Sequence, residues 1–569
     1  MSALIKLVQS VDERTNQMMI GSKIKGAVSE LGDRHVQQML LLPFTLPFSV
    51  RNFVCERPSF GEVKAELQQA LETREQRFLD LVRNCVYSVP ESPYKKLLDH
   101  AGCELGDIAS ALDKSGLEGT LKQLARAGVY LTPAEYKGRQ DVKRGRLSFR
   151  AHAGDFTPPR QFGATSGVIK SSGSTGRPSA NVTSFAWWRV EALAIASFLD
   201  AHNLYTSRVA AYEPILGSMA AGIRFATIAA RLGIPVDRCF VRPTPANNWL
   251  ESLYFRLTTY EIALAARWFG PGFAWPELIS AEHIDRIVRW IEKSRKEGRA
   301  TCIRSVASNA VRIARAANEI GASLEGCTFI SSGEPTTPAK RRAIESAGGA
   351  VAVVWGYVPI GTIAFGCAKP AYDDEMHLSR HSMALIEHPE SIDDTSGEAL
   401  HPLLFTTLYP SAAQLEINVS NGDQAILSER NCGCPMHEAG LTQHVHNVGS
   451  FEKLTSEGMA FSIDEIYELL ETELPNRFGG DIGDYQLVEE EANDAKNYLT
   501  LLVNPGIGPI DDVALLKFLT AALASGSRNK RFMARVWQEA GTLRVRRQAP
   551  IASSRGKVLP LRMTAKSSN

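Results

Sequence analysis

The sequence predicts an α/β protein, with a large N-terminal domain built on mixed and parallel sheets and a small, mobile α+β domain at the C-terminus. Three observations carry this prediction: the length, a βαβ pattern in the middle of the chain, and a change of pattern near residue 449. The 569 residues are enough for several domain-sized units. Hydrophobic residues make up 44% and charged residues 22%, which is ordinary for a globular protein with a sizeable core.

The βαβ pattern is the clearest element signal. Residues 324–331 (LEGCTFIS) predict a strand, and residues 333–335 predict the turn after it. Thr337 can then cap a helix that has proline at its first position, and residues 350–355 predict a second strand. Such units have a right-handed crossover and parallel strands, and their ligands bind at the carboxyl ends of the strands. The turn and the end of the second strand are therefore candidate site positions.

Three regions divide the chain. We expect an N-terminal helical or irregular extension at 1–58, a large domain at 59–448, and a small C-terminal domain at 449–569. Apolar residues recur at helical spacing after Ser59, which predicts a helix that ends before Pro90. A second helix is expected at residues 94–101.

The C-terminal region reads as a small α+β unit that ends in a polar tail. Residues 462–465 form a capping box that opens a helix to Leu470. A strand at 497–503, a helix at 511–523 and a strand at 542–546 are expected to follow.

Composition excludes several classes of protein. Lys and Arg number 63 and Asp and Glu 62, so the net charge of +1 does not indicate a nucleic-acid or membrane-surface protein. Nine cysteines in a chain of this length do not form a disulfide scaffold. The N-terminus lacks the long apolar stretch of a signal peptide, and the most apolar segment, 39–54, is too short and too broken to span a bilayer. The expected location is the cytoplasm.

The sharpest local motif is the run 170–178 (KSSGSTGRP). Its glycines and hydroxyl residues alternate, so that backbone N–H groups and side-chain hydroxyls can surround phosphate oxygens. The spacing differs from that of a Walker A loop. A flexible Ser/Gly linker is the alternative interpretation of the motif alone.

Four motifs in order resemble the adenylate-forming superfamily of acyl- and aryl-CoA ligases. They are SSGSTGRP at 171–178, SGEPTTP at 332–338, SNGD at 420–423 and ASSRGK at 552–557. The segment 82–102 and the non-lysine residue Ser179 resemble the phenylacetate-CoA ligase branch. The resemblance covers roughly residues 60 to 560. It implies that the large domain at 59–448 binds ATP and the acyl group and that the small domain at 449–569 is a mobile lid.

The resemblance assigns roles to these motifs. It implies Lys557 as the catalytic residue, which places a positive charge at the carboxylate and the α-phosphate, and Asp423 as the ligand of the ribose hydroxyls. Three alternatives without a catalytic or binding role remain open. Lys557 can be a solvated tail lysine, Asp423 a hairpin-turn residue and Glu334 a surface turn residue. The implied nucleotide-binding residues are Ser171, Ser172, Gly173, Ser174, Thr175, Gly176, Gly333, Glu334, Pro335, Trp355, Gly356 and Asp423.

A candidate metal site lies in a second group of residues. Cys367 and His377 flank one loop, and Cys432 and Cys434 form a C-x-C pair. Three thiols and one imidazole match a structural Zn²⁺ site, and the phenylacetate-ligase branch resembles this pattern. The rival ligands are His381, His437, His444 and His446. The alternative is four unrelated residues, with the buried cysteines acting as small hydrophobic side chains.

Two motifs depart from the superfamily pattern. The tyrosine of its Y-G-x-[ST]-E element becomes Trp355, which can serve as an aromatic wall for adenine, and its acidic position falls on Pro359 or Ile360. The usual carboxylate ligand of Mg²⁺ is therefore missing, although phosphate oxygens and water can also hold the ion. The hinge element, at 449–453, has lost its arginine, which leaves the rotation of the small domain less assured.

The implied function is an ATP-dependent ligase that forms an acyl- or aryl-adenylate and passes the acyl group to CoA. Two alternatives remain: a different acceptor, such as a carrier protein, an amine or a protein thiol, and a non-catalytic nucleotide-binding relative. The expected substrate is a small aromatic or apolar carboxylic acid. The residues behind that expectation are Phe185, Trp187, Trp188 and Phe225, although such aromatic residues more often belong to a core.

Overall fold

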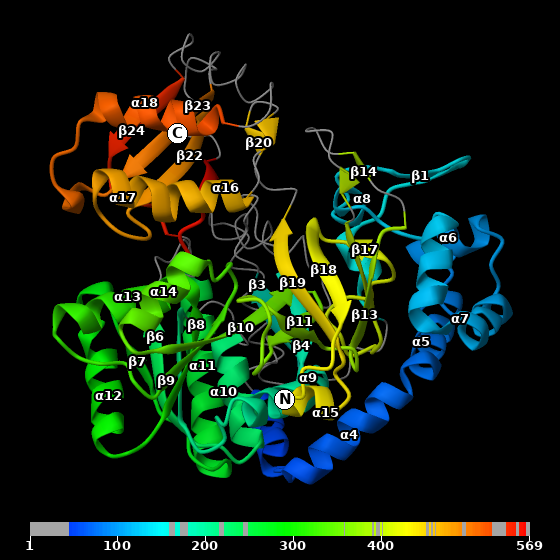
Figure 1. Ribbon diagram of the computed structural model, residues 1–569. Helices are drawn as coiled ribbons and strands as arrows, with labels where there is room; N and C mark the ends of the chain where they lie inside the picture. Colours follow the sequence, from blue (N-terminus) through cyan, green and yellow to red (C-terminus); the bar gives the residue numbers. More distant parts are fainter. Residues whose placement is uncertain are drawn as a thin grey trace, which may run out of the picture.

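The computed structural model describes residues 45–158, 166–170, 180–214, 221–242, 249–357, 359–389, 392–393, 399–400, 402–450, 455–456, 459–460, 463–491, 497–525, 542–552 and 557–564. Within them, helices cover a large central sheet, and a smaller C-terminal unit lies beyond the ends of its strands (Figure 1). The predicted α/β class, with a large mixed-sheet unit and a small α+β unit, is confirmed.

The central sheet has ten strands in the order β18-β19-β12-β11-β10-β9-β8-β5-β6-β7. The six from β10 to β7 run parallel, whereas β11, β12, β19 and β18 join by antiparallel pairing. The strands are β5 (Arg208–Pro214), β6 (Val236–Arg242), β7 (Pro276–Leu278), β8 (Thr301–Val306), β9 (Cys327–Ser332), β10 (Ala350–Tyr357), β11 (Gly361–Gly366), β12 (Met376–Leu378), β18 (Asp423–Glu429) and β19 (Gln443–Ser450).

Helices pack on both faces of the parallel part, as they must when its strands are joined by crossovers. One face packs on α9 (Phe185–Ala201) and α10 (Ala221–Arg231), and it buries Cys302, Ile330 and Val354. The other face packs on α12 (Asp285–Lys296), α13 (Ala307–Glu319) and α14 (Pro338–Ser346), which bury Ile303 and Phe329. The predicted βαβ unit is therefore β9-α14-β10, and Thr337 caps α14 by accepting a hydrogen bond from the backbone N–H of Lys340.

The N-terminal helices begin as predicted. Ser59 caps α4 (Phe60–Glu72) in a reciprocal capping box with Glu62. A break at Thr73 separates α4 from α5 (Arg74–Val82), so the expected single helix is two. The π-helical segment η1 (Arg83–Tyr87), α6 (Pro93–His100) and α7 (Leu105–Arg126) follow. They pack on a second sheet of β13 (Met383–Glu387), β16 (Leu403–Thr407) and β17 (Val419–Ser420).

Part of the predicted extension at 1–58 contributes to the main core. Residues 45–55 are helical, and Leu46, Val50 and Phe53 are buried in the cluster that includes α9. The Phe53 ring lies 5.2 Å from Phe185 and 5.9 Å from Trp188, centroid to centroid. Among the described residues, no helix is both long and apolar enough to cross a bilayer.

The C-terminal unit is a four-stranded sheet covered by helices on one side. Its order is β24-β23-β22-β25, with β22 and β23 antiparallel and the outer strands parallel to their neighbours. Its elements are α16 (Ile463–Glu468), η5 (Leu469–Glu473), α17 (Leu474–Phe478), β22 (Tyr485–Glu491), β23 (Asn497–Val503), α18 (Asp512–Leu523), β24 (Leu543–Arg547) and β25 (Leu561–Thr564). The expected polar tail is wrong in part, because β25 forms an edge of this sheet.

Shorter elements complete the description. They are α8 (Pro133–Tyr136), β1 (Val142–Arg144), β2 (Leu147–Phe149), η2 (Ala153–Phe156), β3 (Ser166–Lys170), β4 (Ala180–Ser184), α11 (Trp249–Phe269), η4 (Ala281–His283), β14 (Ile392–Asp393), β15 (Ala399–Leu400), α15 (Pro435–Glu438), β20 (Thr455–Ser456), β21 (Met459–Ala460) and η6 (Pro505–Ile507).

Candidate active site

The candidate active site lies where the parallel strands β8 and β9 end side by side. Val306 closes β8, and the turn after β9 places Gly333 next to it. Lys557, from the C-terminal unit, reaches this turn. Its Cε and Nζ lie 3.1 and 3.2 Å from the position that a β-carbon on Gly333 would occupy, and Val306 Cγ1 lies 3.6 Å from it. The structure thus brings together two predicted residues that are more than two hundred positions apart.

Gly333 has to be glycine here for two reasons. Its φ is +82°, a left-handed conformation that side chains disfavour, and Lys557 fills the space that a side chain would take. Lys557 itself is 8% exposed. The interpretation of Lys557 as a solvated tail lysine therefore does not fit its position.

Glu334 holds the turn against the start of α13. One carboxylate oxygen accepts a hydrogen bond of 2.6 Å from the backbone N–H of Ser308, and the other accepts one of 2.8 Å from the Ser308 hydroxyl. The Glu334 side chain is only 1% exposed, so it is not a surface turn residue. Pro335 contributes its carbonyl oxygen, which accepts a hydrogen bond of 3.3 Å from Lys340 Nζ.

Lys340 joins this turn to the C-terminal unit. Its ammonium lies 3.0 Å from Glu471 of η5 and 3.7 Å from Glu334, and its side chain is 2% exposed. Thr337 also donates its hydroxyl hydrogen bond to Glu471. Burial alone would lower the pKa of Lys340, but the carboxylates of Glu471 and then Glu334 outweigh it and raise that pKa above its usual value. The ammonium is therefore charged and paired on both sides of the junction.

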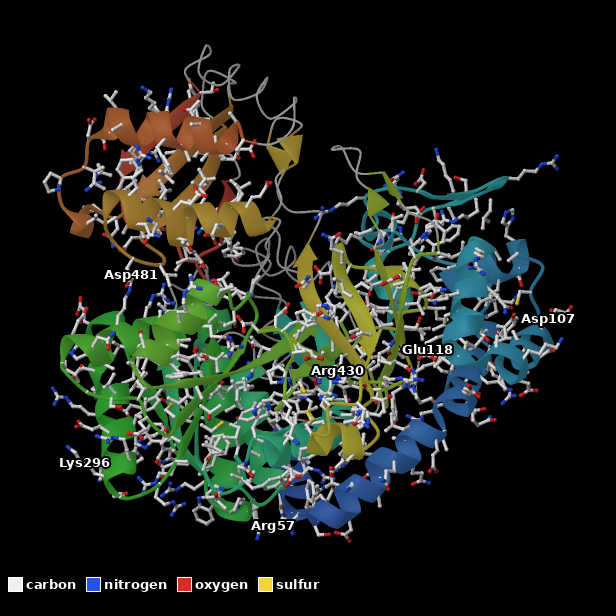
Figure 2. All side chains as sticks on the ribbon, in the orientation of Figure 1. Arg57, Asp107, Glu118, Lys296, Arg430 and Asp481 are labelled. Atoms are coloured by element: carbon white, nitrogen blue, oxygen red, sulfur yellow. The ribbon has the colours of Figure 1, made fainter. Side chains whose placement is uncertain are left out.

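A second ionic contact supports the junction from α13. Arg315 pairs with Asp481 at 2.8 Å, and Figure 2 shows Asp481 at the edge of the C-terminal unit that faces the large unit. A cavity of about 50 Å³ lies between the two units. Its lining includes Ser308, Arg312, Arg315, Lys340, Tyr467 and Val558, the residue that follows Lys557. The C-terminal unit therefore closes over the strand ends at this cavity.

The aromatic and acidic candidates occupy the neighbouring strands. Trp355 is half-buried on β10, edge-on to Phe405, and a β-bulge separates it from the exposed Gly356. Asp423 begins β18, and its carboxylate accepts a hydrogen bond of 2.8 Å from the Asn421 side chain. Burial first, then Glu416 and Asp423, raise the pKa of Tyr357, which places Asp423 in electrostatic reach of β10. The turn interpretation of Asp423 and its binding interpretation are thus compatible.

The phosphate-loop candidates Ser171, Ser172, Gly173, Ser174, Thr175 and Gly176 lie outside the described residues. The strands on either side of them are described, and β3 and β4 pair antiparallel with Lys170 opposite Ala180. Val358 also lies outside the described residues, whereas Pro359 and Ile360 are buried. The position of the missing carboxylate is therefore occupied by buried apolar side chains.

The predicted metal ligands come together at the other end of the large unit. Ligand atoms of Cys367, His377, Cys432 and His444 all lie within 4.8 Å of one another. Cys434 belongs to the same cluster, with its Sγ 3.1 Å from His377 Nε2. Figure 1 shows α15, which begins just after Cys434, on the side of the large unit away from the C-terminal unit. The candidate metal site and the candidate active site are therefore separate.

The polar surroundings of this cluster favour a metal ion. His377 donates its Nδ1–H to the carbonyl oxygen of Leu441 at 2.6 Å, which leaves Nε2 to face the sulfur atoms. A hydrogen bond from Cys367 and then the contact with His377 hold the pKa of Cys434 far below its usual value. His444 is fully buried, and neither of its ring nitrogens has a hydrogen-bond partner among the described residues. Three thiols and an imidazole are a donor set that fits Zn²⁺.

Sequence reasoning missed the partners of several site residues. It gave His444 only as a rival ligand, and it did not single out Lys340 or Arg304. Lys340 follows two residues after Pro338, where the sequence shows only an ordinary helical surface. Arg304 interrupts an otherwise uncharged strand, and this was the one signal that the sequence offered.

Comparison with known proteins comes from structure alone. No protein-family model matches the sequence, and no curated protein does. A 2-hydroxyisobutyryl-CoA ligase in complex with 2-HIB-AMP is similar over 87% of this chain and 89% of its own, with 16% identity and a TM-score of 0.51.

Two further solved structures are more distant. MatB from Rhodopseudomonas palustris, with ATP bound, shares 14% identity over 69% of this chain and 66% of its own, with a TM-score of 0.39. The amide bond synthetase McbA from Marinactinospora thermotolerans shares 13% identity over 88% and 98%, with a TM-score of 0.36. The likeness to the CoA ligase shows that this chain has the fold of an adenylate-forming ligase.

Proposed function

We propose that the protein is an ATP-dependent carboxylate-activating ligase of the phenylacetate-CoA ligase kind. The observation that carries the proposal is the position of Lys557, which is buried against Gly333 at the carboxyl ends of β8 and β9. Ligands of parallel sheets bind at such ends. A cation delivered there by a separate unit matches a reaction between two anions, which needs positioning and charge neutralisation.

The first half-reaction forms the adenylate. A carboxylate oxygen of the acid attacks the α-phosphorus of ATP, the bond to the β-phosphate oxygen breaks, and pyrophosphate leaves. Lys557 offsets the negative charge on the carboxylate and the α-phosphate in the transition state. Glu334 keeps the turn in place through Ser308. In this proposal Trp355 and Gly356 line the adenine, Asp423 accepts hydrogen bonds from the ribose hydroxyls, and the loop 171–176 holds phosphate oxygens.

The second half-reaction transfers the acyl group. The thiol sulfur of CoA attacks the acyl carbon, AMP leaves with the bonding electrons, and the thiol proton passes to solvent. We propose that the C-terminal unit, placed by sequence at 449–569, moves between the two steps. A carrier protein, an amine or a protein thiol is the alternative acceptor, and dependence of AMP release on added CoA distinguishes them.

Mg²⁺ is proposed as the ion that accompanies ATP. Because Pro359 and Ile360 are buried and apolar, this chain would hold the ion through phosphate oxygens and water rather than through a carboxylate at that position. The same residues are the observation that favours a non-catalytic nucleotide-binding relative. Measuring ATP–pyrophosphate exchange with a panel of acids, with and without Mg²⁺, separates the two: ATP binding without exchange supports the relative.

A structural Zn²⁺ is proposed at Cys367, His377, Cys432 and Cys434. The ion would tie the loop after β11 and strand β12 to the C-x-C segment before α15. His444 packs against His377, with ring centroids 4.2 Å apart, and is the competing ligand. A cytoplasmic location remains a prediction from the sequence.

The variant Lys557→Ala tests the proposed function. We expect ATP–pyrophosphate exchange to fall by about a hundredfold or more, since removing one group that stabilises transition-state charge commonly costs that much. Lys517→Ala is the matched control, because Lys517 is an exposed lysine of the same unit, on α18. Exchange that survives in Lys557→Ala at the level of the control would contradict the assignment.

A further inference from the structure

Strand β8 carries a charge in the middle of an apolar face. Cys302, Arg304 and Val306 alternate on the face that packs towards α9 and α10. The cross-strand neighbour of Arg304 on β9 is Ile330, and that of Ile330 on β10 is Ala352, so the row around the guanidinium is aliphatic. Arg304 is 7% exposed. A charged residue at such a position contradicts the local pattern, and functional sites are where such contradictions concentrate.

The guanidinium of Arg304 has fewer hydrogen-bond acceptors around it than it has N–H donors. Among the described residues, its one hydrogen bond runs from Nη1 to the carbonyl oxygen of Ile330, at 3.1 Å. Burial lowers its pKa, and the carboxylate of Glu213 partly offsets this effect. An arginine remains charged at neutral pH and offers five N–H donors. Burying such a group with few acceptors is costly, so the site is expected to gain an acceptor from a ligand.

The neighbouring carboxylates already have other partners. Glu191 accepts a hydrogen bond of 3.0 Å from the backbone N–H of Thr362, and its second oxygen lies 3.4 Å from Arg224. Glu213 accepts a hydrogen bond of 3.0 Å from the backbone N–H of Gly222. Both acids therefore accept hydrogen bonds from backbone donors, and they act on Arg304 through their charge.

Arg304 lines a small cavity of about 20 Å³. Arg224 and Thr362 also line it, and its other walls are apolar and include Ile195, Phe198 and Val354. Val354 directly precedes Trp355, so the cavity adjoins the strand end that carries the candidate adenine wall. The cavity is thus a small, mostly apolar space with a cationic group on its wall, with room for about one polar end group.

Along β8, the cavity at Arg304 lies further from the carboxyl end of the strand than the Gly333 turn that Lys557 contacts. Val306, on the same face as Arg304, is two residues further along β8, a rise of roughly 6.6 Å. Val306 in turn contacts the Gly333 position that Lys557 covers. For its far end to meet Arg304, an acid whose carboxylate lies at Lys557 would therefore have to extend past Val306.

We propose that Arg304 determines substrate specificity by binding an oxygen acceptor at the far end of a short carboxylic acid. The proposal rests on the proposed function, because it assumes that the activated carboxylate lies at Lys557. It narrows the substrate class from apolar acids in general to short acids that carry a distal carbonyl, hydroxyl or carboxylate oxygen. The apolar walls then contact the carbon skeleton.

The test compares acids of one length. Pentanoate has an apolar end, levulinate a neutral carbonyl and glutarate a second carboxylate; benzoate and para-hydroxybenzoate form an aromatic pair. For the wild-type protein, we expect kcat/KM for pyrophosphate release to be about tenfold or more higher with an oxygen-bearing acid, as a hydrogen bond to a charged group implies. Whichever of levulinate and glutarate has the higher kcat/KM shows whether Arg304 binds a neutral or an anionic acceptor. Equal or better use of pentanoate and benzoate would overturn the proposal.

Variants locate the effect. Arg304→Met should reduce the preference to near unity, mainly by lowering kcat/KM for the oxygen-bearing acids, and Arg304→Lys should keep part of it. Arg289→Met, on an exposed arginine of α12, is the matched control and should keep the full preference. If Arg304→Met still preferred the oxygen-bearing acids to the same degree, another group would have to bind the distal oxygen.

A binding measurement separates this proposal from the proposed function. In the wild-type protein, levulinate or glutarate should raise the thermal midpoint and pentanoate should not, whether or not turnover occurs. Failure of every oxygen-bearing acid to stabilise the protein overturns the role of Arg304. Stabilisation without pyrophosphate release supports that role and counts against the adenylate-forming activity.

Discussion

At the residue scale, Gly333 controls where Lys557 can lie. A β-carbon there would approach Lys557 Cε to 3.1 Å, and the φ of +82° disfavours any side chain. In Gly333→Ala we expect a loss of about 1–2 kcal/mol in the free energy of unfolding from the left-handed backbone, together with a large loss of adenylate formation because Lys557 is displaced. Chemical denaturation and ATP–pyrophosphate exchange measure the two effects.

Gly326→Ala separates strain from displacement. Gly326 has a φ of +78°, and nothing lies within 4 Å of where its β-carbon would be. This control should show the same loss of stability with exchange intact. If both variants lost exchange equally, the contact between Gly333 and Lys557 would have no catalytic importance.

The candidate residues that the sequence brought forward stand in short motifs. Gly333, Glu334 and Lys557 came from motifs that resemble a known superfamily and the cysteine pair from its spacing; the structure places Gly333 beside Lys557 and Cys434 beside His377, and their roles remain predictions. Lys340 and Arg304 were not brought forward, since their importance comes from neighbours on other strands and from the second unit. The burial of Lys340 leaves no trace in its own stretch of sequence, and that of Arg304 leaves only a single charge in an otherwise uncharged strand.

At the element scale, the Cys/His cluster predicts a measurable metal. We expect one Zn²⁺ for each wild-type chain, and at least tenfold weaker zinc binding with a lower thermal midpoint in Cys434→Ser, since this thiol lies 3.1 Å from His377 Nε2. Elemental analysis and thermal unfolding with and without a chelator give the result. Cys55→Ser, at an exposed cysteine, should match the wild type.

A second variant settles the fourth ligand. His444→Gln should retain the ion if Cys367, His377, Cys432 and Cys434 hold it. Metal-free wild-type protein, with a thermal midpoint that chelators leave unchanged, would refute the site.

Two helix starts were predicted well, by different signals. Apolar spacing predicted the helix after Ser59, and the capping box with Glu62 emerged only in the structure. Thr337 with Pro338 predicted the start of α14, because such side chains satisfy N–H groups that a helix leaves open. The strand β25 was missed. It is four residues long, and its pairing partner β22 lies more than seventy residues earlier, so only tertiary pairing defines it.

At the scale of the whole molecule, the contact of Lys340 with Glu471 determines how the C-terminal unit sits. Glu471→Gln leaves the buried ammonium with one nearby carboxylate, that of Glu334, 3.7 Å away, besides the Pro335 carbonyl oxygen. We expect the contact between the units to weaken by about 3 kcal/mol. Amide hydrogen exchange should then accelerate in α14 and η5, and adenylate formation should fall. Glu473→Gln changes an exposed acid of the same segment and should leave both unchanged; equal protection in the two variants would show that Glu471 does not hold the junction.

Sequence predicted that two units exist but not how they meet. The capping box near 462 and the later strand-helix-strand pattern marked the C-terminal unit, since both are local signals. The charged residues that join it to α13 and α14 look like ordinary surface residues in the sequence. Their role becomes visible only when the two units are placed together. Their meeting surface is a property of the assembled fold.

The ammonium of Lys340 also bears on the speed of turnover. In the swing that we propose for the C-terminal unit, this ion and Glu471 would have to separate, so their contact would hold the unit closed and slow its opening. Because the pair is buried, dissolved salt screens it weakly. Turnover limited by that opening would change little with ionic strength.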